Sequence, residues 1–348
     1  MTLENYIESI RNKRIAVIGY GVSNRPLADV LLSKGCRVTI CDQRSRETLG
    51  ALADDLETAG AELRLGSDYL KDLDHDLIFR TPGLMPFNEH LQKARERGSI
   101  ITSEMEVFFS LCPCKTIAVT GSDGKTTTTT IISELLKAQG YHVHLGGNIG
   151  HPLLCDVPNI DDDDIAVLEL SSFQLHSMFC KPDTAVITNV SPNHLDKHRD
   201  FQDYVDAKSY IFKNQDKTCR LVLNADDGHT DYYSGQAKAV ISYFSDHKNI
   251  ENGVFLSDGL IRRINQGKTS IIMSSEEILI PGKHNILNYM AAFEATRGLV
   301  SDAVCRKVAV SFPGVEHRLE RVRELNGIVF INDAIGTSPS RTKAGLHA

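Results

Sequence analysis

Short apolar runs alternate with helix-like stretches along the first third of the chain. RIAVIGYG, CRVTICD, AELRLG and DLIFRTPG occupy residues 14–21, 36–42, 61–66 and 76–83. Helical patterns follow the first run at 26–35 and the last at 89–98. Apolar runs of this length beside helical patterns are typical of βαβ units. The pattern predicts an α/β domain with a Rossmann-like parallel sheet at residues 1–111.

The pattern restarts near residue 115 with a strand, a glycine-containing turn and a helix. Further strand-like runs occupy residues 141–147, 165–172, 184–190 and 220–227. From about 241 to 280, short alternating runs with turn signals predict antiparallel hairpins, and residues 282–299 return to a helical pattern. We therefore expect a second α/β domain at residues 112–313, with a small antiparallel sheet.

A third unit is expected from residue 314. It offers a hairpin-like entry, one strand ending at Asp333 and a helix start near residue 338. One strand and one helix cannot form a core of their own. We expect residues 314–348 to be the beginning of a third α/β domain, present here in truncated form.

Composition narrows the class of protein. Lys and Arg number 38 against 45 Asp and Glu in 348 residues, and a net charge of −7 argues against nucleic-acid or membrane-surface partners. No apolar stretch has the roughly 18 residues of a membrane helix, and the N-terminus lacks a secretory signal. Eight scattered cysteines do not suggest a disulfide framework. We expect a cytoplasmic protein, a monomer, with small-molecule partners.

The strongest chemical signal is TGSDGKTT at residues 120–127, between a strand and a helix. Glycines let backbone N–H groups surround phosphate oxygens, Lys125 adds a charge, and the Thr126 hydroxyl can ligate Mg²⁺. The first Gly of the full G-x-x-x-x-G-K-T motif is missing. A threonine-capped turn is the alternative. We expect a nucleotide-binding loop made of Gly121, Ser122, Asp123, Gly124, Lys125, Thr126 and Thr127.

Two polar residues follow other predicted strands. Glu169 ends a buried run, and an acid beside a phosphate loop usually holds Mg²⁺ or its water, although it could instead cap the next helix. His194 follows the run at 184–190, where ligands bind in open α/β sheets, and we favour it as a metal ligand. His194 and His198 are also spaced as in a helical zinc pair, so a zinc hydrolase is a last-ranked alternative. We read His198 as scaffold.

Lys208 lies among apolar residues of an amphipathic segment at 200–215. Its stem could lie along the core with the ammonium in water. A desolvated lysine would instead have a lowered pKa and could react as a neutral amine.

A degenerate dinucleotide fingerprint opens the chain. Gly19 and Gly21 match it, Asn24 replaces the third Gly, and Asp42 stands at the usual distance for a ribose-binding acid. An NAD-dependent dehydrogenase is one reading. Another diphosphate, such as a UDP-sugar, would suit the turn equally well. TPGL at 81–84 gives a second strand-end turn on the same sheet.

Taken together, five ordered motifs resemble the Mur ligases of peptidoglycan synthesis. They are TGSDGKTTT, LELSSFQL, NVSPNHLDKH with a following AK, GKHNILN, and HRLE with NDAIGTSPSRT. The resemblance spans the chain. Within the family, ELSSFQL and the NDxxxTxP stretch favour the members that add D-glutamate to UDP-N-acetylmuramoyl-L-alanine.

The resemblance implies a mechanism. ATP phosphorylates the substrate carboxylate, D-glutamate attacks the acyl phosphate, and two Mg²⁺ ions offset the negative charge. Lys125 and its loop would bind phosphates, and Thr126 and Glu169 would hold the first metal. His194 would ligate the second, a carbamylated Lys208 would orient that metal, and Asn148 would lie near the reacting phosphate.

The resemblance also implies the remaining contacts. Asn285 and Asn288 would lie near the adenine nucleotide. From the third unit, His317, Arg318 and Asp333 would contact ATP. The central domain would thus bind ATP and the third would bind the amino acid. The UDP moiety would lie in the first domain, against Gly21, Val22, Ser23, Asp42, Arg44, Thr81, Pro82 and Gly83.

Two departures from the family qualify this expectation. The family strand end commonly reads NDS, with Ala before the following Thr. Here Ala334 replaces that Ser and Gly336 precedes Thr337, so a hydroxyl contact is lost or moved. The family's larger third domain supplies most of its D-glutamate site. We expect this chain to bind a UDP-sugar without ligating D-glutamate at a useful rate. A non-catalytic UDP-sugar or nucleotide-binding module is the alternative.

Overall fold

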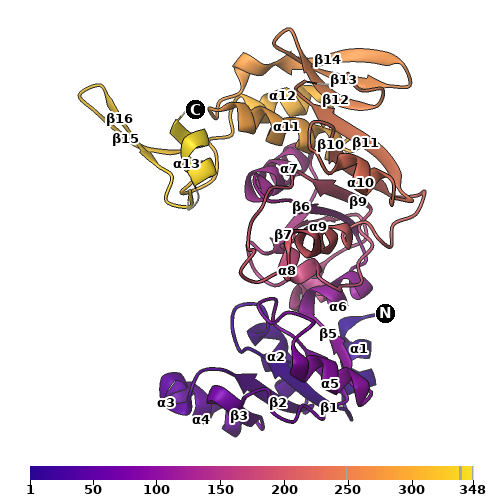
Figure 1. Cartoon of the computed structure of the whole chain (residues 1–348), viewed down its shortest axis with the longest axis vertical. Helices are drawn as coiled ribbons and strands as arrows, with labels where there is room; N and C mark the ends of the chain where they lie inside the picture. The colour runs from indigo at the N-terminus through magenta and orange to yellow at the C-terminus, as the bar shows by residue number, and fades with distance from the viewer. Residues whose placement is uncertain (248, 337–338, 347) are drawn as a thin grey trace.

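The computed structural model describes residues 1–247, 249–336, 339–346 and 348. The chain is elongated, and three parts follow one another along it in sequence order (Figure 1). Each part has its own sheet, of five, nine and two strands respectively. The predicted α/β fold class is confirmed.

The first sheet is parallel throughout, in the order β3-β2-β1-β4-β5. Its strands are β1 (Arg14–Ile18), β2 (Arg37–Asp42), β3 (Glu62–Leu65), β4 (Leu77–Phe79) and β5 (Ile100–Thr102). The accompanying helices are α1 (Leu3–Ile10), α2 (Arg25–Ser33), α3 (Arg46–Leu49), α4 (Ala51–Thr58), α5 (Glu89–Glu96) and α6 (Glu104–Leu111). Strand order reverses between β1 and β4, and ligands of open α/β sheets bind at such a switch point.

The second sheet has the order β14-β13-β12-β11-β10-β9-β6-β8-β7. Its strands are β6 (Lys115–Thr120), β7 (Val143–Gly147), β8 (Ile165–Glu169), β9 (Thr184–Ile187), β10 (Arg220–Asn224), β11 (Val240–Ser245), β12 (Gly253–Ser257), β13 (Leu260–Asn265) and β14 (Lys268–Ser274). Its helices are α7 (Lys125–Gln139), α8 (Ser172–Leu175), α9 (Phe201–Ser209), α10 (Thr230–Ser234), α11 (Lys283–Ala295) and α12 (Asp302–Ala309). The buried residues of α7 and α11 pack in one apolar core against this sheet.

The antiparallel strands differ from the prediction in one respect. They do not form a separate small sheet, because β12 pairs in parallel with β11 and so extends the central sheet. The region assigned to hairpins also contains β11 itself, a parallel strand beside β10. Gly253 permits the close pairing: a Cβ there would overlap the backbone of Tyr243. Only β13 and β14 continue the sheet in antiparallel fashion.

The last part is a hairpin followed by a helix. Strands β15 (Glu320–Leu325) and β16 (Ile328–Asn332) pair antiparallel, and α13 spans Pro339–Leu346. Several apolar hairpin side chains, including Val322 and Phe330, are exposed. Nowhere in the described part of the chain does a helix have the length and apolar character needed to cross a membrane.

Arg80 connects the first sheet to the central part. It follows β4, and its buried guanidinium donates hydrogen bonds to the carbonyl oxygens of Leu84, Phe173, Gln174 and His176 at 2.9–3.3 Å. Three of these carbonyls belong to α8 or its C-terminal end. Burial lowers the pKa of Arg80 to about 10, so the side chain remains charged at neutral pH.

We predict that Arg80→Met lowers the free energy of unfolding by about 2–3 kcal/mol, because several buried carbonyls lose a charged donor. Urea denaturation of both proteins would measure the change. Arg37→Met is the matched control, since Arg37 is an exposed arginine at the start of β2. Equal stability of the two variants would contradict a connecting role for Arg80.

Candidate nucleotide and metal site

The phosphate-binding loop lies between β6 and α7, as the sequence predicts. Gly121 has φ +150° and Gly124 φ +78°, conformations that favour glycine. A Cβ would overlap Thr188 Oγ1 at the first position and Asn288 Oδ1 at the second. Both glycines are therefore required by close neighbours as well as by backbone angles. The loop leads directly into the N-terminus of α7, where anions bind favourably.

The segment after β9 holds this loop in place. Thr188 Oγ1 donates to Asp123 O at 2.6 Å, and Asn189 Oδ1 accepts from Asp123 N at 2.9 Å. Ser122 Oγ donates to Ser191 O at 2.9 Å. Sequence reasoning did not single out these partners. The only available signal was the polar TNVS run at a strand end, which does not identify what it contacts.

Two lysines meet at one carbonyl oxygen. Lys125 Nζ donates to Gly121 O at 3.0 Å, and Lys208 Nζ, from α9, donates to the same atom at 2.9 Å. Lys208 is 1% exposed, which excludes an ammonium in water. Burial and the nearby Lys125 charge hold the pKa of Lys208 well below its ordinary value. The neutral amine is therefore more accessible at Lys208 than at an exposed lysine.

Glu169 offers an oxygen suited to a cation. It ends β8 and is 2% exposed, and its Oε1 accepts a hydrogen bond of 2.8 Å from Asn148 Nδ2. Its Oε2 is buried and has no hydrogen-bond partner among the described residues. A buried carboxylate oxygen without a donor fits a bound metal ion or a metal-bound water. The structure thus brings Asn148 and Glu169 together.

His194 lies in the loop between β9 and α9. It has φ +55°, and Phe173 packs edge-on against its ring at 5.0 Å. Partial desolvation and the charge of Lys125 lower its pKa, which leaves the imidazole neutral and able to ligate a metal at pH 7.

The helical zinc pair is wrong. The backbone from 191 to 199 is not helical, and α9 begins only at Phe201. His198 is buried, with Nδ1 on Asp203 at 3.0 Å and Nε2 on Ser172 at 3.0 Å. Both ring nitrogens are already engaged, so His198 serves as scaffold.

A cavity of about 280 Å³ opens beside the loop. Polar lining comes from the loop, α11 and the C-terminal part, while Phe244, Ile280 and Leu287 supply apolar walls suited to a base. Arg318 Nη2 donates to Thr126 Oγ1 at 2.9 Å, which brings the last part of the chain to the loop. Of the predicted nucleotide residues, the lining includes Asp123, Gly124, Thr127, Asn285, Asn288, Arg318 and Asp333.

His317 is placed differently from the other predicted residues. Its Nδ1 accepts from Asn332 Nδ2 at 2.8 Å, its backbone N–H donates to Glu320, and it does not line the cavity. Thr337, part of the same sequence motif, lies outside the described residues. Lining residues that sequence reasoning missed include Asn224, at the end of β10, and His284.

The first sheet carries a second cavity, of about 380 Å³, at its strand ends. Predicted UDP-contacting residues that line it are Gly21, Asp42, Arg44, Thr81 and Gly83. Ser23 and Pro82 line a separate, smaller cavity with Arg80 and Gln174. Val22 is 78% exposed and lines neither.

Asp42 is already occupied by protein donors. Its Oδ1 and Oδ2 accept from the Arg44 guanidinium at 2.9 and 2.8 Å, and Oδ2 also accepts from Tyr20 N at 2.8 Å. Burial alone would raise its pKa, but the hydrogen bonds from Arg44 and the Tyr20 backbone outweigh burial and lower it. Asp42 therefore orients Arg44 toward the cavity. Because both carboxylate oxygens are used in this way, NAD binding is disfavoured: in an NAD site the acidic residue must accept hydrogen bonds from the ribose hydroxyls.

Comparison with known proteins gives consistent results. Residues 119–296 match the Mur ligase middle domain. The UDP-N-acetylmuramoylalanine–D-glutamate ligase of Acetivibrio thermocellus is 47% identical over 99% of this chain and 74% of its own length. The Clostridium botulinum enzyme of the same name is 46% identical over 97% of this chain and 73% of its own length.

A solved structure supports the fold. The UDP-N-acetylmuramate–alanine ligase of Thermotoga maritima aligns with a TM-score of 0.55 and 20% identity, over 97% of this chain and 77% of that one.

We predict that Gly124→Ala weakens ATP binding about tenfold or more. The new Cβ would displace Asn288 and shift the loop amides, and the loss of one hydrogen bond to the phosphates would cost about this much binding free energy. Calorimetric titration would measure the affinity. Gly140→Ala is the control: Gly140 ends the same helix with φ +108°, and a Cβ there meets no atom within 4 Å. Both variants incur the strain of positive φ. Equal ATP affinities would contradict the steric argument.

Proposed function

This chain belongs to the Mur ligase family, and we propose that it carries the ATP and UDP-sugar sites of a ligase that adds D-glutamate to UDP-N-acetylmuramoyl-L-alanine. The relatives' names and the cavity that joins the phosphate-binding loop to Asn288 and Arg318 support this function. The product is a peptidoglycan precursor. A monomer in the cytoplasm remains our prediction for its state and location.

We propose three functional divisions. Residues 1–111 bind the UDP-sugar, 112–313 bind ATP, and 314–348 begin the amino-acid-binding domain. The five-stranded sheet with its cavity and the nine-stranded sheet with the loop support the first two. Arg318 and Asp333 support contact of the third with ATP, since both line the cavity beside the loop.

The reaction proceeds in two steps. A carboxylate oxygen of UDP-N-acetylmuramoyl-L-alanine attacks the γ-phosphorus of ATP, the bond to the β,γ-bridging oxygen breaks, and ADP leaves. The D-glutamate amine then attacks the carbonyl carbon of the acyl phosphate, loses a proton and expels phosphate. Lys125 and the loop amides stabilise the charge on the transferred phosphoryl group. Asn148, hydrogen-bonded to Glu169, lies at the strand end where this group would react.

Two Mg²⁺ ions fit the donors present. Thr126 and Glu169 would hold one, while His194 and a carbamate on Lys208 would hold the other. Bound Mg²⁺ offsets the negative charge of the phosphates and the carboxylate. Glu169 Oε2, which has no hydrogen-bond partner among the described residues, and the lowered pKa of His194 support these assignments. His317 makes its contacts within the hairpin and would reach ATP only after a local rearrangement.

We predict that Lys125→Ala reduces ATP turnover by about 10²–10³-fold while UDP-sugar affinity stays within twofold, because Lys125 acts on phosphates and the UDP cavity lies on the other sheet. The assay measures ADP release in the presence of UDP-N-acetylmuramoyl-L-alanine, with and without D-glutamate. Calorimetry gives UDP-sugar affinity.

Lys137→Ala provides the control, because Lys137 is exposed in the last turn of the same helix and pairs only with Glu134 at the surface. This control should keep full turnover. Turnover that does not depend on the UDP-sugar would contradict the proposed ligase. Loss of UDP-sugar affinity in Lys125→Ala would contradict the division into two sites.

We predict a carbamate on Lys208. A buried neutral amine can add to CO₂, and the fraction modified should increase as pH rises through its lowered pKa. After incubation with ¹³C-bicarbonate, ¹³C NMR should show one carbamate resonance that Lys208→Arg removes.

Lys213→Ala is the matched control for this measurement. Lys208 Nζ lies 4.2 Å from the centre of the Tyr204 ring. Lys213 Nζ lies similarly, 4.4 Å from that of Tyr210, but Lys213 is exposed. The resonance should persist in this variant. No resonance in the parent chain, with Mg²⁺ and nucleotide present, would contradict carbamylation.

A further inference from the structure

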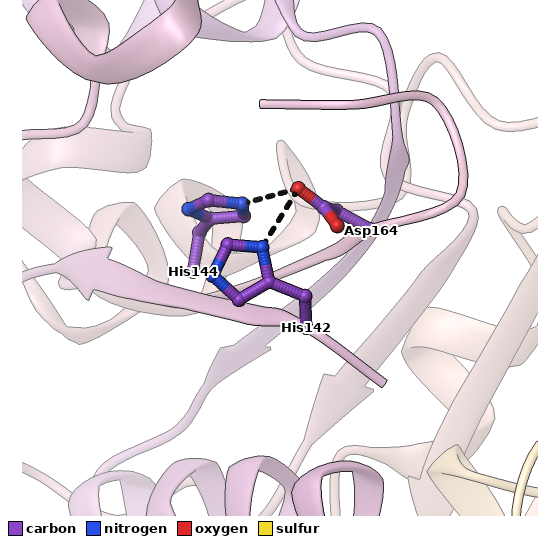
Figure 2. A group of neighbouring side chains, drawn as sticks. All are labelled: His142, His144 and Asp164. Carbon is purple, nitrogen blue, oxygen red and sulfur yellow. Dashed lines mark hydrogen bonds and ion pairs between the residues drawn. The ribbon is translucent and has the colours of Figure 1, made fainter. Parts of the chain in front are cut away.

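A second group of potential ligands lies at the edge of the central sheet. His142 precedes β7, His144 lies within it, and Asp164 immediately precedes β8. Because residues i and i+2 of a strand share a face, both imidazoles project to the same side. Figure 2 shows the two rings directed at the Asp164 carboxylate. The nucleotide chemistry proposed above uses none of these residues.

Three ligand atoms converge here. His144 Nε2 lies 2.7 Å and His142 Nδ1 3.2 Å from the same oxygen, Asp164 Oδ2, and all three atoms lie within 4.8 Å of one another. Zinc bonds of about 2.0–2.2 Å in a tetrahedron place neighbouring ligand atoms about 3.3–3.5 Å apart. Small side-chain rotations would therefore create room for a cation between them.

We propose that His142, His144 and Asp164 bind one divalent transition-metal ion of the Zn²⁺ class. Two imidazoles with one carboxylate suit Zn²⁺, Ni²⁺ or Cu²⁺, whereas Mg²⁺ prefers an all-oxygen shell. The side chain of Asp164 is 7% exposed and that of His142 71%, so the site is anchored on its inner side and open to water on the outer. The outer position is available for a water or an exogenous ligand.

The site lies between the edge strand of the central sheet and its neighbour, so a bound metal would affect the position of that edge strand. β7 is the edge strand of the sheet as the structure describes it, and it pairs along its length with β8. The cluster joins the N-terminal ends of these strands. Asn148 and Glu169 lie at or beyond their C-terminal ends, four to six residues farther along, or roughly 13–20 Å at about 3.3 Å per residue. A metal here would clamp the edge strand that leads to Asn148. The inference does not depend on which ligase reaction the protein performs.

The other histidine cluster is less suited to a metal. This cluster consists of His176, His198 and Asp203. Each carboxylate oxygen of Asp203 is hydrogen-bonded to one of the two rings, and His198 Nε2 is hydrogen-bonded to Ser172. A cation there would displace bonds that hold α8 to α9. At Asp164, by contrast, both rings point to one oxygen, Oδ2, which also accepts from the Asp161 backbone N–H at 3.0 Å.

The test is calorimetric titration of the chelator-treated full chain with ZnCl₂ in buffer containing excess Mg²⁺. We expect one equivalent to bind and to raise the melting temperature, as expected for a ligand of the folded state. His142→Ala should weaken this binding at least tenfold. His142 is exposed, so the variant should fold. Asp164→Asn, of nearly equal shape, should have the same effect.

Controls separate this site from others that take zinc. His151→Ala removes an exposed histidine paired with Asp156 on a different loop and should leave binding unchanged. Cys112→Ser tests the neighbouring thiols of Cys112 and Cys114, whose sulfurs lie 3.5 Å apart. Glu169→Gln tests the proposed Mg²⁺ site. Zinc binding that survives His142→Ala and Asp164→Asn, or that is lost only in Cys112→Ser or Glu169→Gln, would overturn the proposal. Absence of zinc binding by the parent chain would do so as well.

Discussion

The carbonyl oxygen of Gly121 accepts hydrogen bonds from two lysines, and the arrangement of the central site depends on this convergence. Lys125 comes from the loop's own helix and Lys208 from α9, more than eighty residues later. Two ammonium groups this close repel each other, and the interior offers little water to screen them. The arrangement is most favourable when one amine is neutral or when an anion lies between them. The lowered pKa of Lys208 favours a neutral amine there, and a bound phosphate would be the anion between the two lysines.

The same contact explains why distant parts of the chain are needed together. Lys208 reaches Gly121 only because α9 packs beside the loop, where Ser122 Oγ and the Tyr204 hydroxyl are 2.9 Å apart. Asp203, on the same helix, holds His176 and His198 in place. His198 is hydrogen-bonded to Ser172 of α8, and Arg80 donates to the carbonyl of His176 at the end of this helix. α8 follows shortly after Glu169. The first sheet is therefore linked to the strand end that carries Glu169 through a short series of hydrogen bonds.

Much of the fold and part of the site could be predicted from sequence, because the relevant signals are local. A buried strand, a glycine turn and a helix identify the loop without tertiary information, and parallel strands place their carboxyl-end residues at one edge. Glu169 could be singled out on this basis, and Lys208 because it lies among the apolar residues of an amphipathic segment. Their assigned roles in binding metal remain predictions.

Other features depend on pairing between distant segments. Neither Thr188 as a partner of Asp123 nor His142 as a neighbour of Asp164 can be read from local patterns. The β11–β12 pair was missed for a related reason. Short alternating runs fit either a parallel extension or a separate hairpin, and Gly253 decides between them only once its neighbour Tyr243 is known. The helical spacing of His194 and His198 misled because a loop with φ +55° can carry the same spacing.

The Arg318–Thr126 hydrogen bond extends the argument to the last part of the chain. Thr126 lies in the first turn of α7 beside the loop, and its hydroxyl is the group that a loop-bound Mg²⁺ would take as a ligand. In the structure that hydroxyl accepts from Arg318, at 2.9 Å. A hydroxyl oxygen has two lone pairs, so it can accept from a guanidinium and ligate a cation only if the two approach from different sides. If a metal ion were bound to Thr126, repulsion between the two positive charges would favour displacement of Arg318 from this hydroxyl. Nucleotide binding would then be coupled to the position of the C-terminal hairpin, since Leu319 N in the same turn donates to Asp333 Oδ1 at 3.3 Å.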